Sequence, residues 1–314
     1  MREDKWPSVA VLGAGAVGCY FGGMLARAGA PVTLIGRLSQ VQAITADGLY
    51  LETQRFQQHI PVSASTTVEA ARGARVVLFC VKTVDTESAA RMLAPHLAND
   101  AAVVSLQNGV DNVDRIRSVV RGNVIPAVVY VAAEIAAPGH VKHSGRGDLI
   151  IGHVPPRDAS DEAHKRELAS LADLFTRAAV PCQVSDDIQV DLWTKLIMNC
   201  AYNAISALTR RRYGPLTSDP GARTIIEQTV KEVVAVAQAL GIRINGSVLN
   251  AVWKLGAEMM PGALSSTAQD IGRGKRTEID ALNGYVVRRG VELAVPTPVN
   301  QALYALVKML ERQE

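Results

Sequence analysis

The chain has 314 residues and a mass of 33.5 kDa, a length typical of about two domains. Hydrophobic residues make up 48% of it and charged residues 20%, which excludes a disordered or fibrous protein. The 33 lysines and arginines barely outnumber the 30 aspartates and glutamates, so neither nucleic acid nor a membrane surface is expected as a partner.

Residues 8–26 carry no charge and follow Arg2 and Lys5, so they could be mistaken for a signal peptide or a membrane span. Five glycines interrupt this stretch, whereas the core of a signal peptide is richer in leucine. The four cysteines of the chain include no C-x-x-C pair, and the six histidines fall at unrelated spacings. We therefore expect a cytoplasmic protein in a reducing compartment, without a structural metal.

The first half of the chain alternates short β-branched runs with helical stretches, the pattern of a parallel sheet covered on both faces. Strands are predicted at 9–12, 32–35, 76–80, 103–106 and 124–131. Helices are predicted at 16–28, 86–93 and 110–119. Weaker strands at 49–53 and 59–62 are expected to form an edge hairpin. Strands at 141–144 and 149–152 should form another antiparallel pair, with Gly145 and Gly147 at its turn.

From about residue 158 the strand signals nearly vanish, and long amphipathic or apolar stretches take over. Helices are predicted at 158–178, 186–208, 222–240, 245–259, 278–290 and 299–311. Pro181 and the acidic pair Asp186 and Asp187 mark a break and a new helix start. The sequence thus predicts an α/β fold: a Rossmann-type, doubly wound domain over 1–185, then an all-helical domain over 186–314.

A glycine motif, G-A-G-A-V-G, joins the strand at 9–12 to the helix that follows it. Gly13 permits a tight turn, Gly15 lets the backbone approach a pyrophosphate, and Gly18 lets the helix pack on the strand. The helix N-terminus would offer N–H groups and a positive dipole end to the phosphates. We predict a dinucleotide held by Gly13, Ala14, Gly15, Ala16, Val17 and Gly18. The alternative is a glycine-rich turn that binds nothing.

The end of the second strand indicates which dinucleotide is bound. Sites for NAD place an acidic residue there, about 20 residues after the glycines, to hold the ribose 2′-hydroxyl. This chain has Gly36 and Arg37 instead, and a guanidinium suits a 2′-phosphate. NADP is therefore favoured over NAD, unless Arg37 is only a solvated surface residue.

Lys82 and Asn108 follow the strands predicted at 76–80 and 103–106. Ligands of open α/β sheets bind beyond the carboxyl ends of the strands, so both residues are candidate cofactor contacts. Asn108 is also a candidate to face the nicotinamide and the substrate. Taken singly, a surface lysine and an Asn-Gly turn explain the two residues nearly as well.

Polar residues recur every four positions in the helix predicted at 186–208. Lys195, Asn199 and Asn203 therefore line one narrow face, while most of the other positions are apolar. Polar groups on such a helix need partners if they are buried, which a water-filled cleft or a polar ligand would supply. The alternative is a buried network that joins the two domains. A second polar segment, 264–280, could simply cap helices.

These motifs, in this order, resemble the ketopantoate reductase (2-dehydropantoate 2-reductase) family over nearly the whole chain. The shared elements are G-A-G-A-V-G at 13–18, V-K at 81–82, Q-N-G at 107–109, P-G-H-V-K-H at 138–143, W-T-K-L at 193–196 with Asn199 and Asn203, S-S-T-A-Q-D at 265–270 and T-E-I-D at 277–280. The resemblance implies an N-terminal Rossmann domain, a helical C-terminal domain and a cleft between them. It makes a homodimer a family-level expectation only.

The resemblance also assigns roles to single residues. NADPH would lie along the glycine turn, near Lys82 and Asn108. Lys195 falls on the family's general acid, while Asn199, Asn203 and Ser266 fall on residues that hold the 2-oxo acid. Glu278 matches a glutamate near the cofactor and the catalytic lysine. In this scheme an ammonium stabilises the charge on the substrate's carbonyl oxygen and supplies a proton, and no metal is needed.

Two positions depart from the family pattern. Ala263 and Tyr213 stand where some members carry asparagine, which puts the identity of the 2-oxo acid in doubt.

The leading hypothesis is NADPH-dependent reduction of ketopantoate to pantoate in pantothenate synthesis. Two alternatives stay open: a reductase for another bulky 2-oxo acid, and a non-catalytic NADP(H)-binding sensor. The retained Lys195 and Glu278 argue against the sensor.

Overall fold

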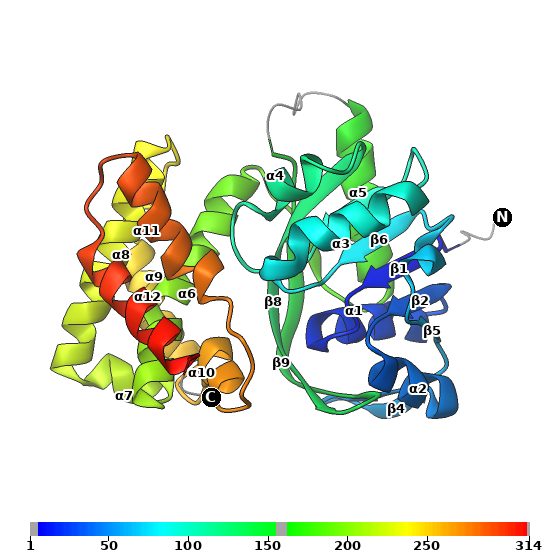
Figure 1. Ribbon diagram of the computed structural model, residues 1–314, viewed down its shortest axis with the longest axis horizontal. Coiled ribbons are helices and arrows are strands. Elements are labelled where there is room, and N and C mark those ends of the chain that lie inside the picture. Colours follow the sequence, from blue (N-terminus) through cyan, green and yellow to red (C-terminus); the bar gives the residue numbers. More distant parts are fainter. Residues whose placement is uncertain (1–5, 155–161, 313–314) are drawn as a thin grey trace. The chain divides into compact units, whose positions relative to one another are not determined.

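The computed structural model describes residues 6–154 and 162–312 (Figure 1). It divides into two compact units. The first comprises Met1–Gln107 and Asp111–Ile188, and the second comprises Asn108–Val110 and Gln189–Glu314. Asn108 therefore belongs to the second unit, although a strand of the first unit ends only three residues before it.

A parallel sheet in the order β5, β2, β1, β6, β7, β8 forms the centre of the first unit. Its strands are β1 (Val9–Leu12), β2 (Val32–Ile35), β5 (Ser63–Ser65), β6 (Val76–Phe79), β7 (Ala102–Ser105) and β8 (Asn123–Ala137). The order of the strands reverses between β1 and β6, the kind of switch point at which open α/β sheets bind ligands. The predicted Rossmann-type fold is confirmed.

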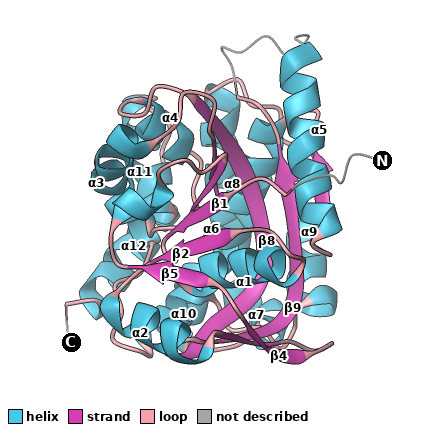
Figure 2. Ribbon diagram, turned by 90° about the vertical axis from the view of Figure 1, so that its right-hand side faces the viewer, coloured by secondary structure: helices cyan, strands magenta, loops and turns pink. Residues whose placement is uncertain are grey.

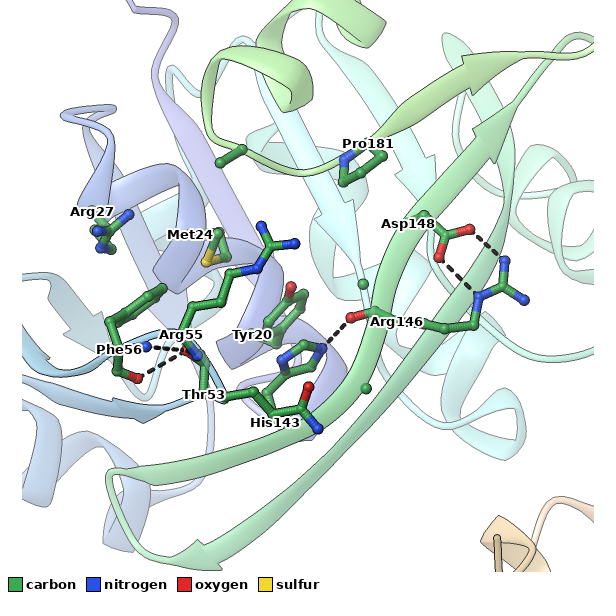
Figure 3. Close-up of a pocket in the computed structure, with 14 residues that line it drawn as sticks. Tyr20, Met24, Arg27, Thr53, Arg55, Phe56, His143, Arg146, Asp148 and Pro181 are labelled. Atoms are coloured by element: carbon green, nitrogen blue, oxygen red, sulfur yellow. Dashed lines mark hydrogen bonds and ion pairs between the residues drawn. The ribbon is translucent and has the colours of Figure 1, made fainter. Parts of the chain in front are cut away.

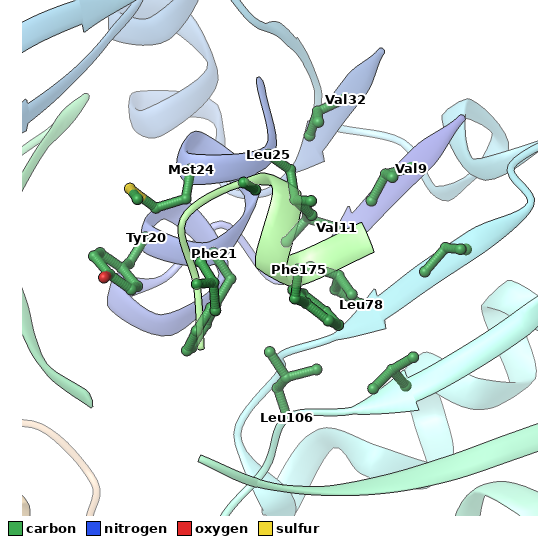
Figure 4. Close-up of a cluster of buried hydrophobic side chains, with 14 of the residues drawn as sticks. Val9, Val11, Tyr20, Phe21, Met24, Leu25, Val32, Leu78, Leu106 and Phe175 are labelled. Atoms are coloured by element: carbon green, nitrogen blue, oxygen red, sulfur yellow. The ribbon is translucent and has the colours of Figure 1, made fainter. Parts of the chain in front are cut away.

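Both faces of this sheet are buried because its strands are rich in β-branched and aliphatic residues. Alternate residues point to opposite faces. Val76 and Leu78 pack in one core with Phe175 (Figure 4), while Val77 and Phe79, which point to the other face, are buried as completely. The helices of this unit are α1 (Ala16–Arg27), α2 (Leu38–Asp47), α3 (Thr86–Leu93), α4 (Asn112–Arg117) and α5 (Glu162–Arg177).

The long strand β8 also pairs antiparallel with β9 (His140–Ile151), as Figure 2 shows. Strand β9 pairs in parallel with β3 (Leu49–Glu52) and with β10 (Cys182–Val184). The outermost strand, β4 (Gln57–Ile60), pairs antiparallel with β3. The predicted edge hairpin is confirmed.

The predicted turn at Gly145 and Gly147 is wrong, because both glycines lie inside the single strand β9. The register between β8 and β9 shifts near them, between Tyr130 and Val131 and between Ala132 and Ala133. Gly147 has a φ of 138°. The two glycines thus accommodate irregularities within a continuous strand pair rather than a change of direction.

The second unit is helical. Its helices are α6 (Ile188–Thr209, whose first residue is counted with the first unit), α7 (Tyr213–Ser218), α8 (Pro220–Ala239), α9 (Val248–Lys254), α10 (Ser266–Ile271), α11 (Asn283–Glu292) and α12 (Pro298–Leu310). Its main core takes side chains from α6, α8, α9 and α11. Within the described ranges, no helix is both long and apolar enough to cross a bilayer.

Three of the predicted helices differ in detail. The helix predicted at 245–259 is α-helical only to Lys254, and a π-helical turn follows where Gly256 packs against the Tyr202 hydroxyl. The helix predicted at 278–290 begins at Asn283, after a short 3₁₀ turn. The start of the helix predicted at 158–178 lies outside the described residues, and α5 is described from Glu162. The sequence did not predict helices α2, α7 and α10 or strands β5 and β10.

Candidate functional site

The glycine turn follows β1 directly. Gly13 and Ala14 both donate backbone hydrogen bonds to the carbonyl of Ile35, at 3.0 and 2.9 Å, which fixes the turn beside the end of β2. Gly13 has a φ of 108°, a conformation that favours glycine. Gly15 is the N-cap of α1, and the Cys19 N–H donates to the Gly15 carbonyl at 2.8 Å. The three N–H groups between them therefore have no acceptor within the helix.

The three glycines of the motif leave room for different neighbours. A Cβ on Gly13 would lie 2.7 Å from the carbonyl carbon of Cys80, and one on Gly18 would collide with the carbonyl oxygen of Gly13. A Cβ on Gly15 would meet nothing within 4 Å. Gly13 and Gly18 thus allow close packing within the protein, while Gly15 faces open space. This arrangement fits a pyrophosphate lying on the start of α1.

Two predicted cofactor contacts follow segments that pack on this turn. Gly36 lies against Ala14, so Arg37, the N-cap residue of α2, lies close to the glycine motif. Arg37 is exposed, and its guanidinium makes no hydrogen bond or ion pair with the described residues. On the other side, Cys80 and Val81 pack on Gly13 and lead to the half-buried Lys82. The first unit therefore brings Arg37 and Lys82 to the same edge of the sheet as the glycine turn.

Gln107 holds the segment around Lys82, a role that the sequence did not reveal. Its buried side-chain amide donates to the Val81 carbonyl at 3.0 Å and to the Thr86 hydroxyl at 2.8 Å. Its amide oxygen accepts from the Ser105 hydroxyl at 3.0 Å. The signals in the sequence are its place between a strand end and Asn108 and its part in the Q-N-G motif at 107–109.

Helix α6 carries the predicted polar face of the second unit. Lys195, Asn199 and Asn203 lie one turn apart, among side chains such as Leu196 and Ile197 that are fully buried. Lys195 and Asn199 are half-buried, whereas Asn203 is buried. The side chain of Asn199 forms no hydrogen bond with any described residue. We call Lys195, Asn199 and Asn203 the polar stripe.

The segment before α10 packs against the last turns of α6. Asn203 donates through Nδ2 to the Ser266 hydroxyl at 3.4 Å, and the Ser265 hydroxyl donates to the Asn203 carbonyl at 3.1 Å. Ser265 also caps α10, since its hydroxyl oxygen accepts from the Ala268 N–H at 3.0 Å. Two predicted substrate contacts, Asn203 and Ser266, are therefore adjacent, and the exposed Ser266 remains accessible.

Asn108 and Glu278 also come together within the second unit. Asn108 donates through Nδ2 to Oε2 of Glu278 at 2.8 Å, across 170 positions of sequence. Both side chains are half-buried. Elsewhere in the described ranges, no three or more histidine, cysteine, aspartate or glutamate side chains are grouped so that they could hold a metal ion. The second unit thus supplies an amine, amides, a hydroxyl and a carboxylate.

Two family models match the chain. The one described as "Ketopantoate reductase PanE/ApbA" matches residues 9–156, and its C-terminal counterpart matches residues 187–311. The chain belongs to the ketopantoate reductase family. The resemblance inferred from the ordered motifs is confirmed, and the two matches together leave out residues 1–8, 157–186 and 312–314.

Curated relatives and solved structures agree with this membership. The 2-dehydropantoate 2-reductase of Pyrococcus abyssi is 32% identical over 97% of this chain and 98% of the relative. That of Halobacterium salinarum is also 32% identical, over 97% and 99%. The crystal structure of a PanE/ApbA family ketopantoate reductase from Ralstonia eutropha JMP134 has 50% identity and a TM-score of 0.90, covering 98% and 99%.

The fold of the ketopantoate reductase family also matches a structure with another name. A D-mandelate dehydrogenase in complex with NADH has 25% identity and a TM-score of 0.86, covering 98% of this chain and 99% of that one. The same two-part fold therefore occurs in a protein named for a different 2-hydroxy acid, so the fold by itself does not specify the substrate.

Proposed function

We propose that the protein reduces 2-dehydropantoate (ketopantoate) to pantoate, in pantothenate synthesis, with NADPH as the reductant. The near full-length match to relatives named 2-dehydropantoate 2-reductase carries this proposal. The open face of Gly15 and the N–H groups at the start of α1 fit a nicotinamide dinucleotide, with Gly13–Gly18 around its pyrophosphate. When bound, the reduced nicotinamide supplies the hydride that the carbonyl carbon of the substrate receives.

The polar stripe supplies the groups that this reaction requires from the protein. We assign Lys195 as the general acid that stabilises the developing negative charge on the carbonyl oxygen and protonates it. Asn199, Asn203 and Ser266 would hold the substrate's carboxylate and hydroxyl groups. Glu278 and its partner Asn108 would orient the reacting groups near the nicotinamide, with Lys82 as a further cofactor contact.

Lys195→Ala tests this assignment. We expect kcat/KM for ketopantoate to fall about 10²- to 10⁴-fold, the usual contribution of a positioned general acid, measured by NADPH oxidation. Lys231→Ala is the matched control, because Lys231 is an exposed helix lysine of the same unit with no partner among the described residues. If Lys195→Ala turned over as fast as the control, the mechanism would be wrong.

Arg37 supports NADPH as the preferred cofactor, because this N-cap residue of α2 follows Gly36, which packs on the glycine turn, and its guanidinium has no partner among the described residues. Arg37→Ala should weaken NADPH binding about tenfold or more, the value of a lost charge-assisted contact, and leave NADH binding nearly unchanged. Fluorescence titration with both nucleotides measures this. Equal losses for NADPH and NADH would contradict the assignment.

A reductase for another bulky 2-oxo acid is the second candidate. Tyr213 and Ala263, the two positions that depart from the family pattern, lie side by side, since the Tyr213 N–H donates to the Ala263 carbonyl at 3.1 Å. The D-mandelate dehydrogenase of the same fold shows that such proteins can carry the name of an aromatic substrate. A panel of aliphatic and aromatic 2-oxo acids, compared by kcat/KM, distinguishes the two candidates.

We also propose that the protein acts in the cytoplasm, because all four of its cysteines are free thiols, as in proteins of reducing compartments.

The family resemblance further leads us to expect a homodimer, which sedimentation at several protein concentrations would test.

A further inference from the structure

The first unit contains a cavity that none of the predicted cofactor or substrate residues lines. It lies beside α1, the turn at 53–56, strand β9 and the segment before β10, and its volume is about 480 Å³ (Figure 3). Cavities of about 300–1,000 Å³ are typical of small-molecule sites. We call it the Tyr20 cavity, after the residue at its centre.

Tyr20 presents an unsatisfied hydroxyl at this cavity. Only 4% of the residue is exposed, and its ring stacks on His143 with 4.3 Å between the ring centroids. The hydroxyl has no hydrogen-bond partner among the described residues. It lies against Gly147, where a Cβ would collide with it. The hydroxyl therefore faces the cavity without a partner from the described part of the chain and is available to a ligand.

Arg55 supplies an uncompensated positive charge at the same cavity. Its exposed guanidinium forms no ion pair with the described residues, and Figure 3 shows its side chain reaching across the cavity above Tyr20. Burial lowers the pKa of His143, and backbone hydrogen bonds with Arg146 and Gly145 oppose that change. The charge of Arg55 adds a smaller lowering of the same pKa. Burial likewise raises the pKa of Tyr20, and Arg55 opposes that rise. Arg55 is therefore close enough to act on both rings.

The two other arginines of the cavity are already engaged. Arg27 stacks on Phe56 with its guanidinium carbon 4.0 Å from the ring centroid, and it donates to Gln58 at 3.2 Å. Arg146 pairs with Asp148 at 2.6 Å and stacks on a tyrosine ring on the neighbouring strand. The Arg55 guanidinium and the Tyr20 hydroxyl, in contrast, have no hydrogen-bond or ion-pair partner among the residues that the structure describes.

The rest of the lining is largely apolar. Met24 is buried beside Tyr20 on α1, and the half-buried ring of Phe56 and the ring of Pro181 face the same space (Figure 3). A positive charge and a hydroxyl next to such surfaces match a ligand with an anionic head and an apolar body.

We propose that the Tyr20 cavity binds a small organic oxyanion, a carboxylate or phosphate monoester on an apolar or aromatic body. Arg55 and the Tyr20 hydroxyl hold the oxyanion, and Met24 and Phe56 contact the body. The site is separate from the glycine turn, because none of the turn residues lines it.

The test uses the full chain labelled with ¹³C in its seven methionine methyl groups, with Met24→Leu identifying the Met24 resonance. Phenyl phosphate and benzoate are the anionic probes, and benzyl alcohol is the neutral control. We expect one or both anions to move the Met24 resonance saturably at millimolar concentrations, and benzyl alcohol not to do so. Which anion binds more tightly tells whether the head is a phosphate ester or a carboxylate.

Variants then locate the binding groups. Arg55→Gln and Tyr20→Phe should each raise the Kd of the tighter anion about tenfold, the equivalent of one charge-assisted hydrogen bond. Arg121→Gln is the matched control, since Arg121 is exposed in the same unit, does not line the cavity and has no partner among the described residues. A Met24 resonance unmoved by either anion, or equal losses in Arg121→Gln, would overturn the proposal.

Discussion

Two groups of polar side chains in the second unit lie among similar apolar helices. They differ in how many of their hydrogen-bonding atoms have partners within the protein. The polar stripe on α6 includes an amide, that of Asn199, with no partner among the described residues. The other grouping, the Glu232 network, comprises Glu232, Asn283 and Asn300 and joins α8, α11 and α12. Glu232 accepts from the N–H groups of Val299 and Asn300, both at 2.9 Å, and from Nδ2 of Asn300 at 2.8 Å.

Every polar side-chain atom of the Glu232 network has a partner among the described residues except Oδ1 of Asn283, which is buried without one. Asn283 donates to Oδ1 of Asn300 at 3.0 Å, and Glu232 binds N–H groups in the first turn of α12, where a negative charge is stabilising. A network of this kind has a structural role. We propose that the half-buried amide of Asn199, which has no partner among the described residues, is instead available to a ligand.

The largest effect that separates the two groupings should be on stability. Asn300→Leu removes a fully buried side chain that bonds to the Thr229 carbonyl and to Glu232. We expect the free energy of unfolding to fall by about 2–4 kcal/mol, because Glu232 and Asn283 each lose a hydrogen bond to the buried Asn300 side chain, although Glu232 keeps two backbone N–H donors. Urea denaturation measures the loss, while kcat/KM of the folded protein should stay the same.

The control for this variant is Asn250→Leu, an exposed asparagine on α9 with no described partner. It should change stability by about 0.5 kcal/mol or less. A loss of activity in folded Asn300→Leu would place the Glu232 network in the site and remove the contrast.

Asn199→Leu should show the opposite pattern at a smaller scale. We expect kcat/KM for the preferred 2-oxo acid to fall about 10- to 100-fold, the value of one hydrogen bond to a charged group. The melting temperature should be unchanged or higher, because the half-buried amide has no described partner to lose. Thermal unfolding alongside steady-state kinetics checks both. A clear loss of stability with normal kinetics would make Asn199 structural.

The smallest effect concerns an ion-pair cluster that belongs to neither grouping. It comprises Asp280, Tyr304, Lys308 and Glu311. Burial raises the pKa of Asp280, but the hydrogen bonds from Tyr304 and Lys308 outweigh it and hold that pKa below its ordinary 3.8. Burial also raises the pKa of Glu311, but the hydrogen bond from Lys308 lowers it, and the pKa is held below its ordinary 4.5. The resulting stabilisation is present above these ordinary values and is lost as the pH falls through the lower, folded-state values.

Lys308→Met should therefore lower stability at pH 7 by about 1 kcal/mol or less, since the cluster is partly exposed. It should also weaken the dependence of stability on pH below about 4. Urea denaturation at pH 7 and pH 3 measures both effects. The same loss at both values, relative to the parent, would show that the pairing is not the cause.

The sequence allowed much of the fold to be predicted, because the signals involved are local. The strand at β1, the glycine turn and α1 are contiguous, and the spacing of Lys195, Asn199 and Asn203 is itself the evidence for a shared helix face. The turn in β9 was predicted wrongly because glycines favour both turns and bulges, and only pairing with β8 decides between them.

Contacts between distant segments could not be predicted from one sequence. The hydrogen bond of Asn108 to Glu278 joins residues 170 positions apart, and Gln107 meets Val81 and Thr86 only after the sheet has formed. The Tyr20 cavity likewise depends on four segments whose individual sequences look ordinary. Family resemblance supplied roles for Asn108 and Glu278, but not the bond between them.

The free cysteines have a practical consequence for following this protein in solution. Burial raises the pKa of Cys19 and of Cys182 to about 12, and it raises those of Cys80 and Cys200 as well. Thiols in this state are poor nucleophiles at neutral pH, because the thiolate is the reactive form. We therefore expect the four native cysteines to react slowly with maleimides at neutral pH. A single cysteine engineered at an exposed position should take up a fluorophore or spin label selectively.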